Sequence, residues 1–386
     1  MAGRRLCRPE PRELRRGRTK IGRVSTNSAF ALPAATALPA AHPLMNGRTA
    51  DSALITTYRG IRGPVTPVWF MRQAGRSLPE YRALRVGNEM LNACLDPELS
   101  SEITLQPVRR HGVDSAIFFS DIVIPLKVAG IDVDIVPGRG PVLGKPIRTA
   151  ADVAALPSLA PRALEAISAG VARTVEQLGK TPLIGFAGAP FTLAAYLVEG
   201  GPSKEHLSAR TLMHADPETW HALLHWAADV TGAFLRAQVL AGASAAQLFD
   251  SWVGSLSLAD YTNHVAAHSK RALDAIADLD VPKVHFGVGS GEVLPAMHAI
   301  GADVMGVDWR IPLAEANRRL GGAVPLQGNI DPAMLAAPWP VLKAHVLDVL
   351  ESGEAAPAHV LNLGHGVPPD TDPDQLTRIV ELVHGR

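Results

Sequence analysis

The chain has 386 residues, of which 47% are apolar, and its 37 basic side chains equal its 37 acidic ones. This composition is typical of a globular protein and excludes a disordered chain. Because no apolar run reaches about 18 residues, we expect no transmembrane helix and no membrane partner. Two cysteines, Cys7 and Cys94, are too few for a disulfide framework or a zinc set, which favours a reducing, cytoplasmic setting.

The charge is unevenly distributed along the chain. Residues 1–23 hold nine Lys or Arg residues against Glu10 and Glu13. Subtracting them from the totals of 37 leaves 28 basic and 35 acidic residues, so the remainder carries about −7. A mildly acidic body excludes general binding to nucleic acid.

Residues 1–53 differ from the rest of the chain and are expected to lie outside the folded domain. "RRLCRPEPRELRRGRTK" is rich in arginine, and "SAFALPAATALPAAHP" is a low-complexity Ala/Pro stretch. Three interpretations remain open: a disordered tail, translated upstream sequence with Met45 as the true start, or a transit-like peptide. The fold prediction therefore concerns one domain, residues 54–386.

Short apolar, β-branched runs recur from residue 67 onward. They are continuously apolar rather than alternating, as in parallel strands that are buried on both faces. The eight runs are 67–71, 115–120, 182–188, 245–251, 281–288, 302–309, 323–329 and 359–365.

The segments between these runs have helical patterns. Residues 217–241, for example, carry apolar residues three and four apart. Asp followed by Pro marks the start of a helix, with Asp as the N-cap and Pro at the first helical position. Four such aspartates are predicted to cap helices and to have no chemical role: Asp96, Asp216, Asp331 and Asp372.

Eight strands that alternate with helices predict an α/β protein with a single (β/α)8 TIM barrel. A doubly wound open sheet is the alternative. After the second strand, residues 132–147 are predicted to form a hairpin around Gly138 and Gly140. A helix over about 161–179 follows, and we interpret hairpin and helix together as an insertion in the barrel.

In such a barrel the functional residues lie at the carboxyl ends of the strands. Each polar residue there also has a structural interpretation. Arg72 and Arg76 could pair with Glu80 or with other acids around the rim, Asp121 could brace a turn, and Asp308 is expected to form a salt bridge beside Arg310. The candidates are Arg72, Gln73, Arg76, Ser120, Asp121, Tyr196, Asp250, Ser251, Asp308, Asn329 and His365.

Several other chemistries are excluded by their missing motifs. "GVGSGE" (287–292) lacks the third glycine of a dinucleotide-binding loop, and no GxxxxGK[ST], HExxH or GxSxG occurs. The histidines are scattered singly, and Cys94 is interpreted as a structural thiol. We therefore predict no metal and no cofactor.

Two arginines and one carboxylate indicate the charge of the substrate. Arginine binds carboxylates in a planar, bidentate manner, so Arg72 and Arg76 predict an anionic substrate with more than one carboxylate. Asp121 predicts that positive charge develops on that substrate during the reaction.

The stretch "PVWFMRQAGRSLPEYR" (67–82) resembles the signature of the uroporphyrinogen decarboxylase family. Ser77 is a departure, since many members carry an aromatic residue there. The resemblance covers about residues 54–385. Further similar segments follow in the family's order: "FFSDIVIPLKVAG" (118–130), "IGFAGAPFTLAAYLVEGG" (184–201), "QLFDSWVG" (247–254), "GVDW" (306–309), "QGNIDP" (327–332) and "NLGHGVPPDTDP" (362–373).

The resemblance implies a (β/α)8 barrel, a homodimer, and decarboxylation of the four acetates of uroporphyrinogen III to give coproporphyrinogen III, without metal or cofactor. Asp121, Arg72 and Tyr196 would be the catalytic residues. The resemblance leaves the proton donor open between Arg72, a substrate carboxylic acid and a relayed water. The implied substrate contacts are Arg72, Gln73, Ala74, Gly75, Arg76, Asp121, Tyr196, Ser251 and His365.

Two other functions are alternatives to this one. A corrinoid zinc methyltransferase shares the barrel but needs a His-x-Cys pair and a later Cys, whereas no Cys follows Cys94 here. A non-catalytic tetrapyrrole-binding protein would not need Arg72, Asp121, Tyr196 and His365 together.

Overall fold

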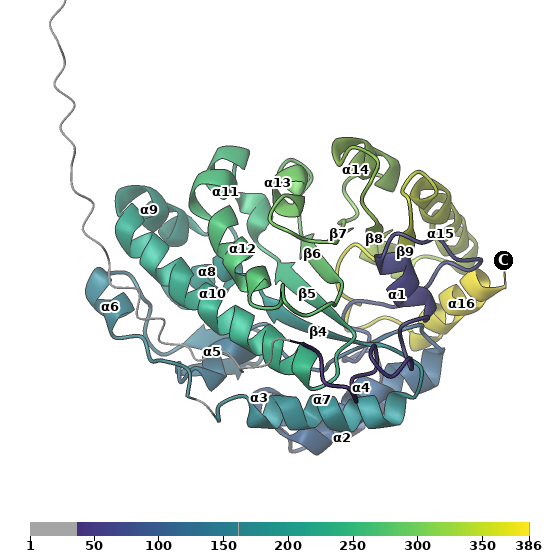
Figure 1. Cartoon of the computed structure of the whole chain (residues 1–386), viewed down its shortest axis with the longest axis horizontal. Helices are drawn as coiled ribbons and strands as arrows, with labels where there is room; N and C mark the ends of the chain where they lie inside the picture. The colour runs from purple at the N-terminus through teal and green to yellow at the C-terminus, as the bar shows by residue number, and fades with distance from the viewer. Residues whose placement is uncertain (1–36, 161, 386) are drawn as a thin grey trace, which may run out of the picture.

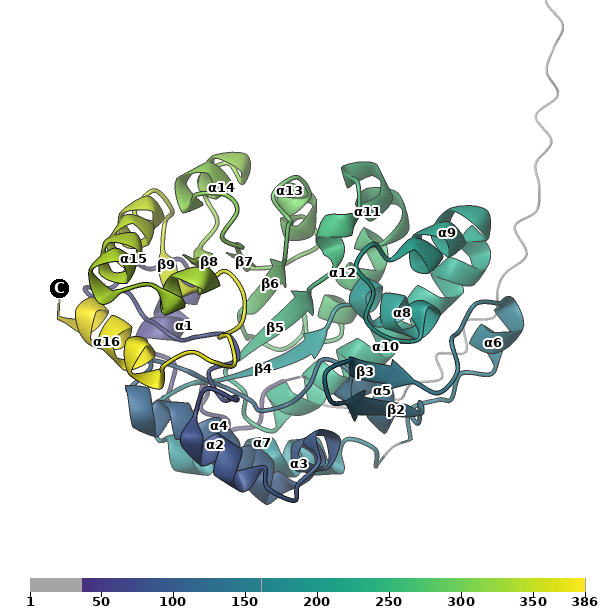
Figure 2. The same ribbon diagram turned by 180° about the vertical axis from the view of Figure 1, so that it is seen from behind.

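The computed structural model describes residues 37–160 and 162–385. Its centre is a curled sheet of seven parallel strands in the order β1-β4-β5-β6-β7-β8-β9, with helices around its outer face (Figures 1 and 2). Seven of the eight predicted runs are thus strands. Their bounds are β1 Ala116–Ile117, β4 Leu183–Gly188, β5 Ala245–Asp250, β6 Lys283–Gly287, β7 Val304–Gly306, β8 Leu326–Ile330 and β9 His359–Leu363.

The remaining predicted run, residues 67–71, contacts both edges of this sheet without forming a regular strand. Val68 forms a parallel bridge with Leu361 of β9, and the Leu361 N–H donates to the Pro67 carbonyl over 2.9 Å. On the other side, the Asp114 N–H donates to the Val68 carbonyl over 2.9 Å, just before β1. The Val68 N–H donates to the Asp114 carboxylate (2.7 Å) instead of a strand carbonyl, which keeps this pairing irregular.

The helices that cover the sheet are connected to it by short loops. Their bounds are α1 Ala53–Tyr58, α2 Pro79–Leu84, α3 Met90–Leu95, α4 Pro97–His111, α5 Ile124–Val128, α6 Ala150–Ala154, α7 Glu165–Leu178, α8 Pro190–Glu199, α9 Leu207–Ala215, α10 Pro217–Leu240, α11 Leu258–His264, α12 Ala266–Asp274, α13 Leu294–His298, α14 Leu313–Arg319, α15 Trp339–Gly353 and α16 Pro373–His384, with 3-10 turns η1 Val253–Ser255 and η2 Pro332–Ala336.

All four predicted Asp-Pro caps are confirmed. The Asp96 carboxylate accepts the N–H groups of Glu98 and Leu99 at the start of α4, and Asp216 accepts the Thr219 N–H at the start of α10. Asp331 and Asp372 cap η2 and α16 in the same way. These carboxylates satisfy N–H groups that have no partner within the helix, so their role is structural.

The glycine pair predicted to form a turn lies in a hairpin outside the main sheet. Strands β2 Val133–Val136 and β3 Gly140–Leu143 pair antiparallel, and Gly138 and Gly140 have φ angles of 75° and 90°. The Leu143 N–H donates to the Gly200 carbonyl (3.1 Å), so the hairpin lies against the C-terminal end of α8. Figure 2 shows it in front of α5.

Residues 37–52 pack against the end of α10. The buried His42 ring places Nε2 at 3.1 Å from the Val239 carbonyl and 3.2 Å from the Ala243 carbonyl. The Thr49 and Ser244 hydroxyls are 2.8 Å apart. The predicted boundary at residue 54 therefore falls within a packed segment, while residues 1–36 lie outside the described residues.

We expect His42→Ala to lower the free energy of unfolding by about 1–3 kcal/mol, because two buried carbonyls lose their donor. Urea unfolding of the full chain measures this. Asn46→Ala, an exposed change in the same turn, is the matched control and should have little effect. Equal stability of the two variants would show that the packing of this segment contributes nothing.

Candidate active site

The turn after residues 67–71 holds Arg72 in an unusual conformation. Its φ angle is 60°, in the left-handed region that non-glycine residues rarely adopt, and its side chain is exposed. The Gln73 side chain is fully buried, accepts the Phe70 N–H and donates to the Ser115 carbonyl, each over 3.0 Å. Gln73 thus braces the turn from inside rather than lining an open wall, whereas Ala74 and Gly75 are half-buried.

The loop after β9 lies directly against Arg72. The Val367 N–H donates to the Met71 carbonyl over 2.9 Å. A Cβ on Gly366 would lie 2.3 Å from Cδ of Arg72, so only glycine leaves room for the arginine side chain there. His365 is half-buried, and burial together with the charges of Arg72 and Arg310 lowers its pKa to about 4. The imidazole is therefore neutral near pH 7.

Asp121 follows β1 by four residues and begins the turn into α5. Its Oδ1 accepts the Val123 N–H (3.0 Å), so it does brace a turn. Burial raises its pKa, while that hydrogen bond and the positive charge of Arg72 act in the opposite direction. The buried Cys94 thiol accepts the Asp121 N–H, and burial and the Asp121 charge raise the pKa of that thiol. A thiol held protonated is not a nucleophile.

Tyr196 on α8 is part of an aromatic stack. Its ring centroid lies 4.0 Å from that of Trp252, and His206 stacks on Trp252 at 4.3 Å. Ser251, half-buried, directly precedes Trp252. Sequence reasoning missed Trp252 and His206. The position of Trp252 beside Ser251 was an available signal, whereas nothing in the sequence indicated His206.

Three of the predicted residues lie near Arg72. Its charge acts on Asp121, Tyr196 and His365, and Asp121 also acts on Tyr196. Burial and Asp121 both raise the pKa of Tyr196, so its hydroxyl stays protonated. The structure thus brings together residues from four separate segments of the chain.

Arg76 is exposed and lines a pocket that does not include Asp121, Tyr196 or His365. It lines a pocket of about 640 Å³ whose other residues are Tyr81, Arg82, Arg85, Val86, Pro369 and Asp370. Ser77, beside it, is buried. The excess of cationic side chains in this pocket suits an anionic ligand.

The ion-pair interpretation of the two arginines is wrong. Glu80 pairs instead with Arg110, through two contacts of 2.7 and 2.8 Å. Within residues 37–160 and 162–385, neither Arg72 nor Arg76 forms an ion pair. Both guanidiniums are thus available to a ligand.

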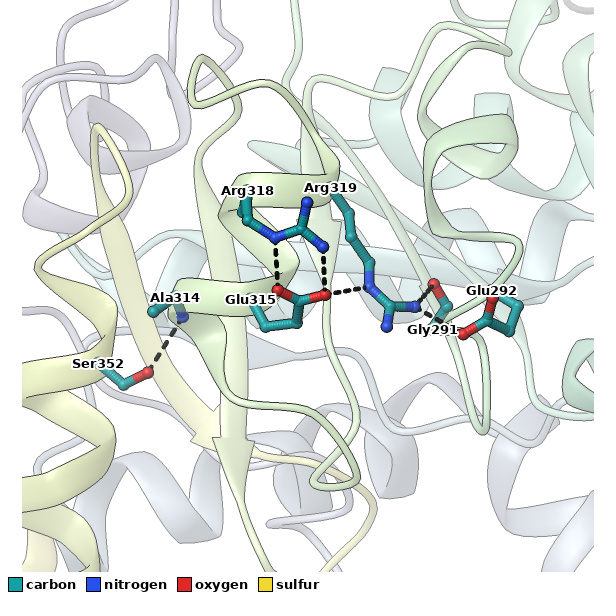
Figure 3. Close-up of polar contacts among 7 residues, drawn as sticks. All are labelled: Gly291, Glu292, Ala314, Glu315, Arg318, Arg319 and Ser352. Atoms are coloured by element: carbon teal, nitrogen blue, oxygen red, sulfur yellow. Dashed lines mark hydrogen bonds and ion pairs between the residues drawn. The ribbon is translucent and has the colours of Figure 1, made fainter.

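Asp308 and the glycine-rich loop after β6 have structural roles, as predicted for Asp308. Asp308 pairs with Arg310 and accepts the Gly289 N–H over 2.6 Å. Figure 3 shows Arg319 donating to the Gly291 carbonyl and to Glu292, each over 2.8 Å, while Glu315 holds both Arg318 and Arg319. These contacts fix the loop to α14.

Asp250 lies buried beneath the Ser251–Trp252 turn. The Thr192 hydroxyl donates to its Oδ1 (2.7 Å) and accepts the Trp252 N–H (3.3 Å). Oδ2 has no hydrogen-bond partner among the described residues, and burial raises the pKa of Asp250 to about 7. The carboxyl is thus held protonated below neutral pH.

We expect Asp250→Asn to be more stable than the wild type above pH 7. A carboxyl whose folded pKa is raised from 3.8 to about 7 stabilises the fold fully below pH 4, and this contribution is lost as the pH rises to about 7. The amide has no such titration, so the difference grows over this range, by a few kcal/mol at most. Urea unfolding at pH 5 and pH 8 measures it, and a pH-independent difference would refute the buried titration.

A curled parallel α/β sheet with free cations, one partly buried carboxylate and hydroxyls at its strand ends defines the class of barrel-type α/β enzymes that act on anionic substrates. The uroporphyrinogen decarboxylase family model matches residues 49–386, and the chain belongs to this family. Proteins named uroporphyrinogen decarboxylase from Arthrobacter sp. and Leifsonia xyli are 70% and 64% identical to it. The alignments cover 88% and 91% of this chain and 99% and 98% of those relatives.

A solved structure also matches the fold. A methyltransferase from Methanosarcina mazei superposes with a TM-score of 0.74 over 87% of this chain and 98% of that one. At 19% identity this likeness concerns the fold alone. In the described part of the chain, no helix is long and apolar enough to cross a membrane.

Proposed function

We propose that this protein removes the carboxyl groups from the four acetate side chains of uroporphyrinogen III, giving coproporphyrinogen III in porphyrin and haem biosynthesis. It is a carboxy-lyase of the family to which the chain belongs. Within the site, one observation supports the proposal most. Arg72 has no ion pair among the described residues and lies beside the partly buried Asp121.

Each residue of the site has a role that its surroundings support. Arg72 and Arg76 bind substrate carboxylates. Asp121 accepts hydrogen bonds from the pyrrole N–H groups, because its second oxygen has no role in the turn to Val123. Three further groups contact the substrate without adding charge: Tyr196, Ser251 and His365.

The reaction needs an electron sink before the carbon–carbon bond can break. Protonation of the pyrrole α-carbon, next to the carbon that bears the acetate, makes the ring cationic and leaves the acetate CH2 conjugated with the iminium. The bond to the carboxylate then breaks, CO2 leaves, and the electron pair forms a double bond between the ring carbon and the exocyclic CH2, which neutralises the iminium. A second proton adds to that CH2 to make the methyl group, and release of the first proton from the α-carbon restores the pyrrole. Each turnover therefore takes up one proton and releases one CO2. The Asp121 carboxylate stabilises the cation, a contribution of about 3–4 kcal/mol for one well-placed group.

The neutral state of His365 is part of this arrangement. An imidazolium beside Arg72 would oppose the developing ring cation, and the pKa of about 4 prevents it from forming at neutral pH. A neutral imidazole still offers one donor and one acceptor to the substrate.

We also propose a closed barrel, a homodimer and a cytoplasmic location. The two-sided contacts of residues 67–71 support a closed eight-stranded barrel over an open sheet. The homodimer is carried over from the family resemblance, and sedimentation of the purified protein tests it. The cytoplasmic location rests on the low cysteine count.

Stepwise decarboxylation of uroporphyrinogen III by the purified full chain tests the function. We expect the hepta-, hexa- and pentacarboxylate intermediates to appear in succession, followed by the tetracarboxylate product. Binding of the substrate without loss of any carboxyl would instead favour the non-catalytic tetrapyrrole-binding protein.

A further inference from the structure

Five histidines gather on the outer surface of the fold, away from the strand-end site. His214 is on α9, His221 and His225 are on α10, His264 ends α11, and His268 is on α12. We call them the histidine cluster. The expectation that the histidines are scattered singly is therefore wrong. A spacing of four residues places His221 and His225 on one face of α10, whereas His214, His264 and His268 come from three other helices, which helix packing brings together in a way that the sequence does not specify.

Three side chains at one end of the cluster form a compact donor set. His214, Asp260 and His264 each offer one ligand atom, and these atoms all lie within 4.8 Å of one another. Nε2 of His214 is 3.4 Å from Oδ1 of Asp260. The side chain of His214 is 56% exposed and that of Asp260 only 17%, so the set opens to solvent on the α9 side. Both views show α9 and α11 as neighbours (Figures 1 and 2).

The surroundings hold the His264 ring in place and leave one nitrogen unused. The Trp220 indole N–H donates to the His264 carbonyl (3.2 Å), which fixes the end of α11 against α10. Nδ1 of His264 is buried and has no hydrogen-bond partner among the described residues. A buried polar atom without a partner is costly, and one ring nitrogen of His264 is thus free to bind a ligand or donate a proton.

Two neighbouring histidines, His221 and His268, lie next to the His264 ring. The His221 ring lies 5.7 Å from that of His264, and Nδ1 of His221 is 2.9 Å from Nε2 of His268. The rings of His221 and His268 thus pack beside His264 on the protein side of the donor set.

We propose that His214, Asp260 and His264 bind a divalent transition-metal ion of the zinc class. Two imidazole nitrogens and one carboxylate oxygen form a donor set suited to Zn²⁺, Co²⁺ or Ni²⁺, whereas Mg²⁺ and Ca²⁺ prefer oxygen ligands alone. With three protein ligands, the remaining positions belong to water. The ion joins α9 to α11 and plays no part in the decarboxylation, whose residues lie at the strand ends.

Titration of the tag-free, chelator-treated full chain with Zn²⁺ and Co²⁺ tests the proposal. We expect one ion per chain, a Co²⁺ absorption band typical of nitrogen and oxygen ligands, a higher Tm with the ion, and no competition from Mg²⁺. His214→Ala and Asp260→Asn should each weaken binding by about 100-fold or more, since even outer-shell partners contribute about 10–100-fold.

His225→Ala is the matched control. His225 belongs to the histidine cluster, but its Nε2 faces Asp229 at 3.7 Å, outside the three ligands, so this variant should bind the ion as the wild type does. Because His214 is exposed, His214→Ala should keep its fold, which its Tm without metal and its decarboxylase activity verify. Absence of stoichiometric binding, or binding unchanged in His214→Ala, overturns the proposal.

Discussion

Asp121→Asn is expected to lower kcat by about 10²–10³-fold while the variant still binds product through its carboxylate contacts. The substitution removes the negative charge that stabilises the protonated pyrrole but keeps an oxygen that accepts the Val123 N–H. The turn into α5 therefore persists, whereas the second oxygen is replaced by an NH2 group that cannot accept a pyrrole N–H. Steady-state decarboxylation and equilibrium binding of coproporphyrinogen measure the two quantities separately.

The pH profile sharpens this test. Because burial raises the pKa of Asp121, the acid limb of kcat should reflect its ionisation, and the limb should disappear in Asp121→Asn. Asp121→Ala serves as the comparison, since it also removes the acceptor for Val123 and should lose stability as well. Turnover like that of the wild type in Asp121→Asn would exclude the proposed role of the charge.

Arg72→Gly is expected to lose about 10²-fold or more in kcat/KM without loss of folding stability. Two charge-assisted hydrogen bonds to a carboxylate contribute about 1.5–3 kcal/mol each. Glycine accepts the φ angle of 60° at no steric cost, whereas an L-residue in this region costs about 1–2 kcal/mol. Activity and stability should therefore respond differently, as expected where strain is retained for function.

Arg76→Gly is the matched control, because it removes the same group from a residue whose φ angle is not positive. It should weaken substrate binding but gain no relief of strain. Gly366→Ala complements both, since its Cβ would lie 2.3 Å from Cδ of Arg72 and displace that side chain while retaining its charge. If Arg72→Gly kept full activity, Arg72 would not bind substrate.

The sequence predicted most of the sheet because buried parallel strands have a recognisable composition. Continuous apolar runs located seven strands, and Asp-Pro pairs located four caps, since both signals are local. The run at 67–71 proved irregular because the Asp114 carboxylate, 46 residues away, accepts the Val68 N–H in place of a strand carbonyl. A contact at that separation has no local signature.

In the candidate site, too, the sequence predicted features with local signals but not the contacts between distant residues. Sequence motifs selected Arg72, Asp121, Tyr196, Ser251 and His365, and their resemblance to a family supplied a substrate. The sequence could not show that Glu80 pairs with Arg110 and so leaves Arg72 without an ion pair among the described residues. It also could not show that Gln73 is buried beneath the turn, because burial depends on what packs over a residue.

By itself the sequence determined the types of the elements, their caps and the chemical groups at the strand ends, because these follow from local composition and spacing. Only the tertiary structure decided which groups meet: Gly366 against Arg72, His206 against Trp252, and His214 beside Asp260 and His264. Each of these contacts joins separate elements. Their geometry is set by the packing of whole helices and loops, which no short stretch of sequence specifies.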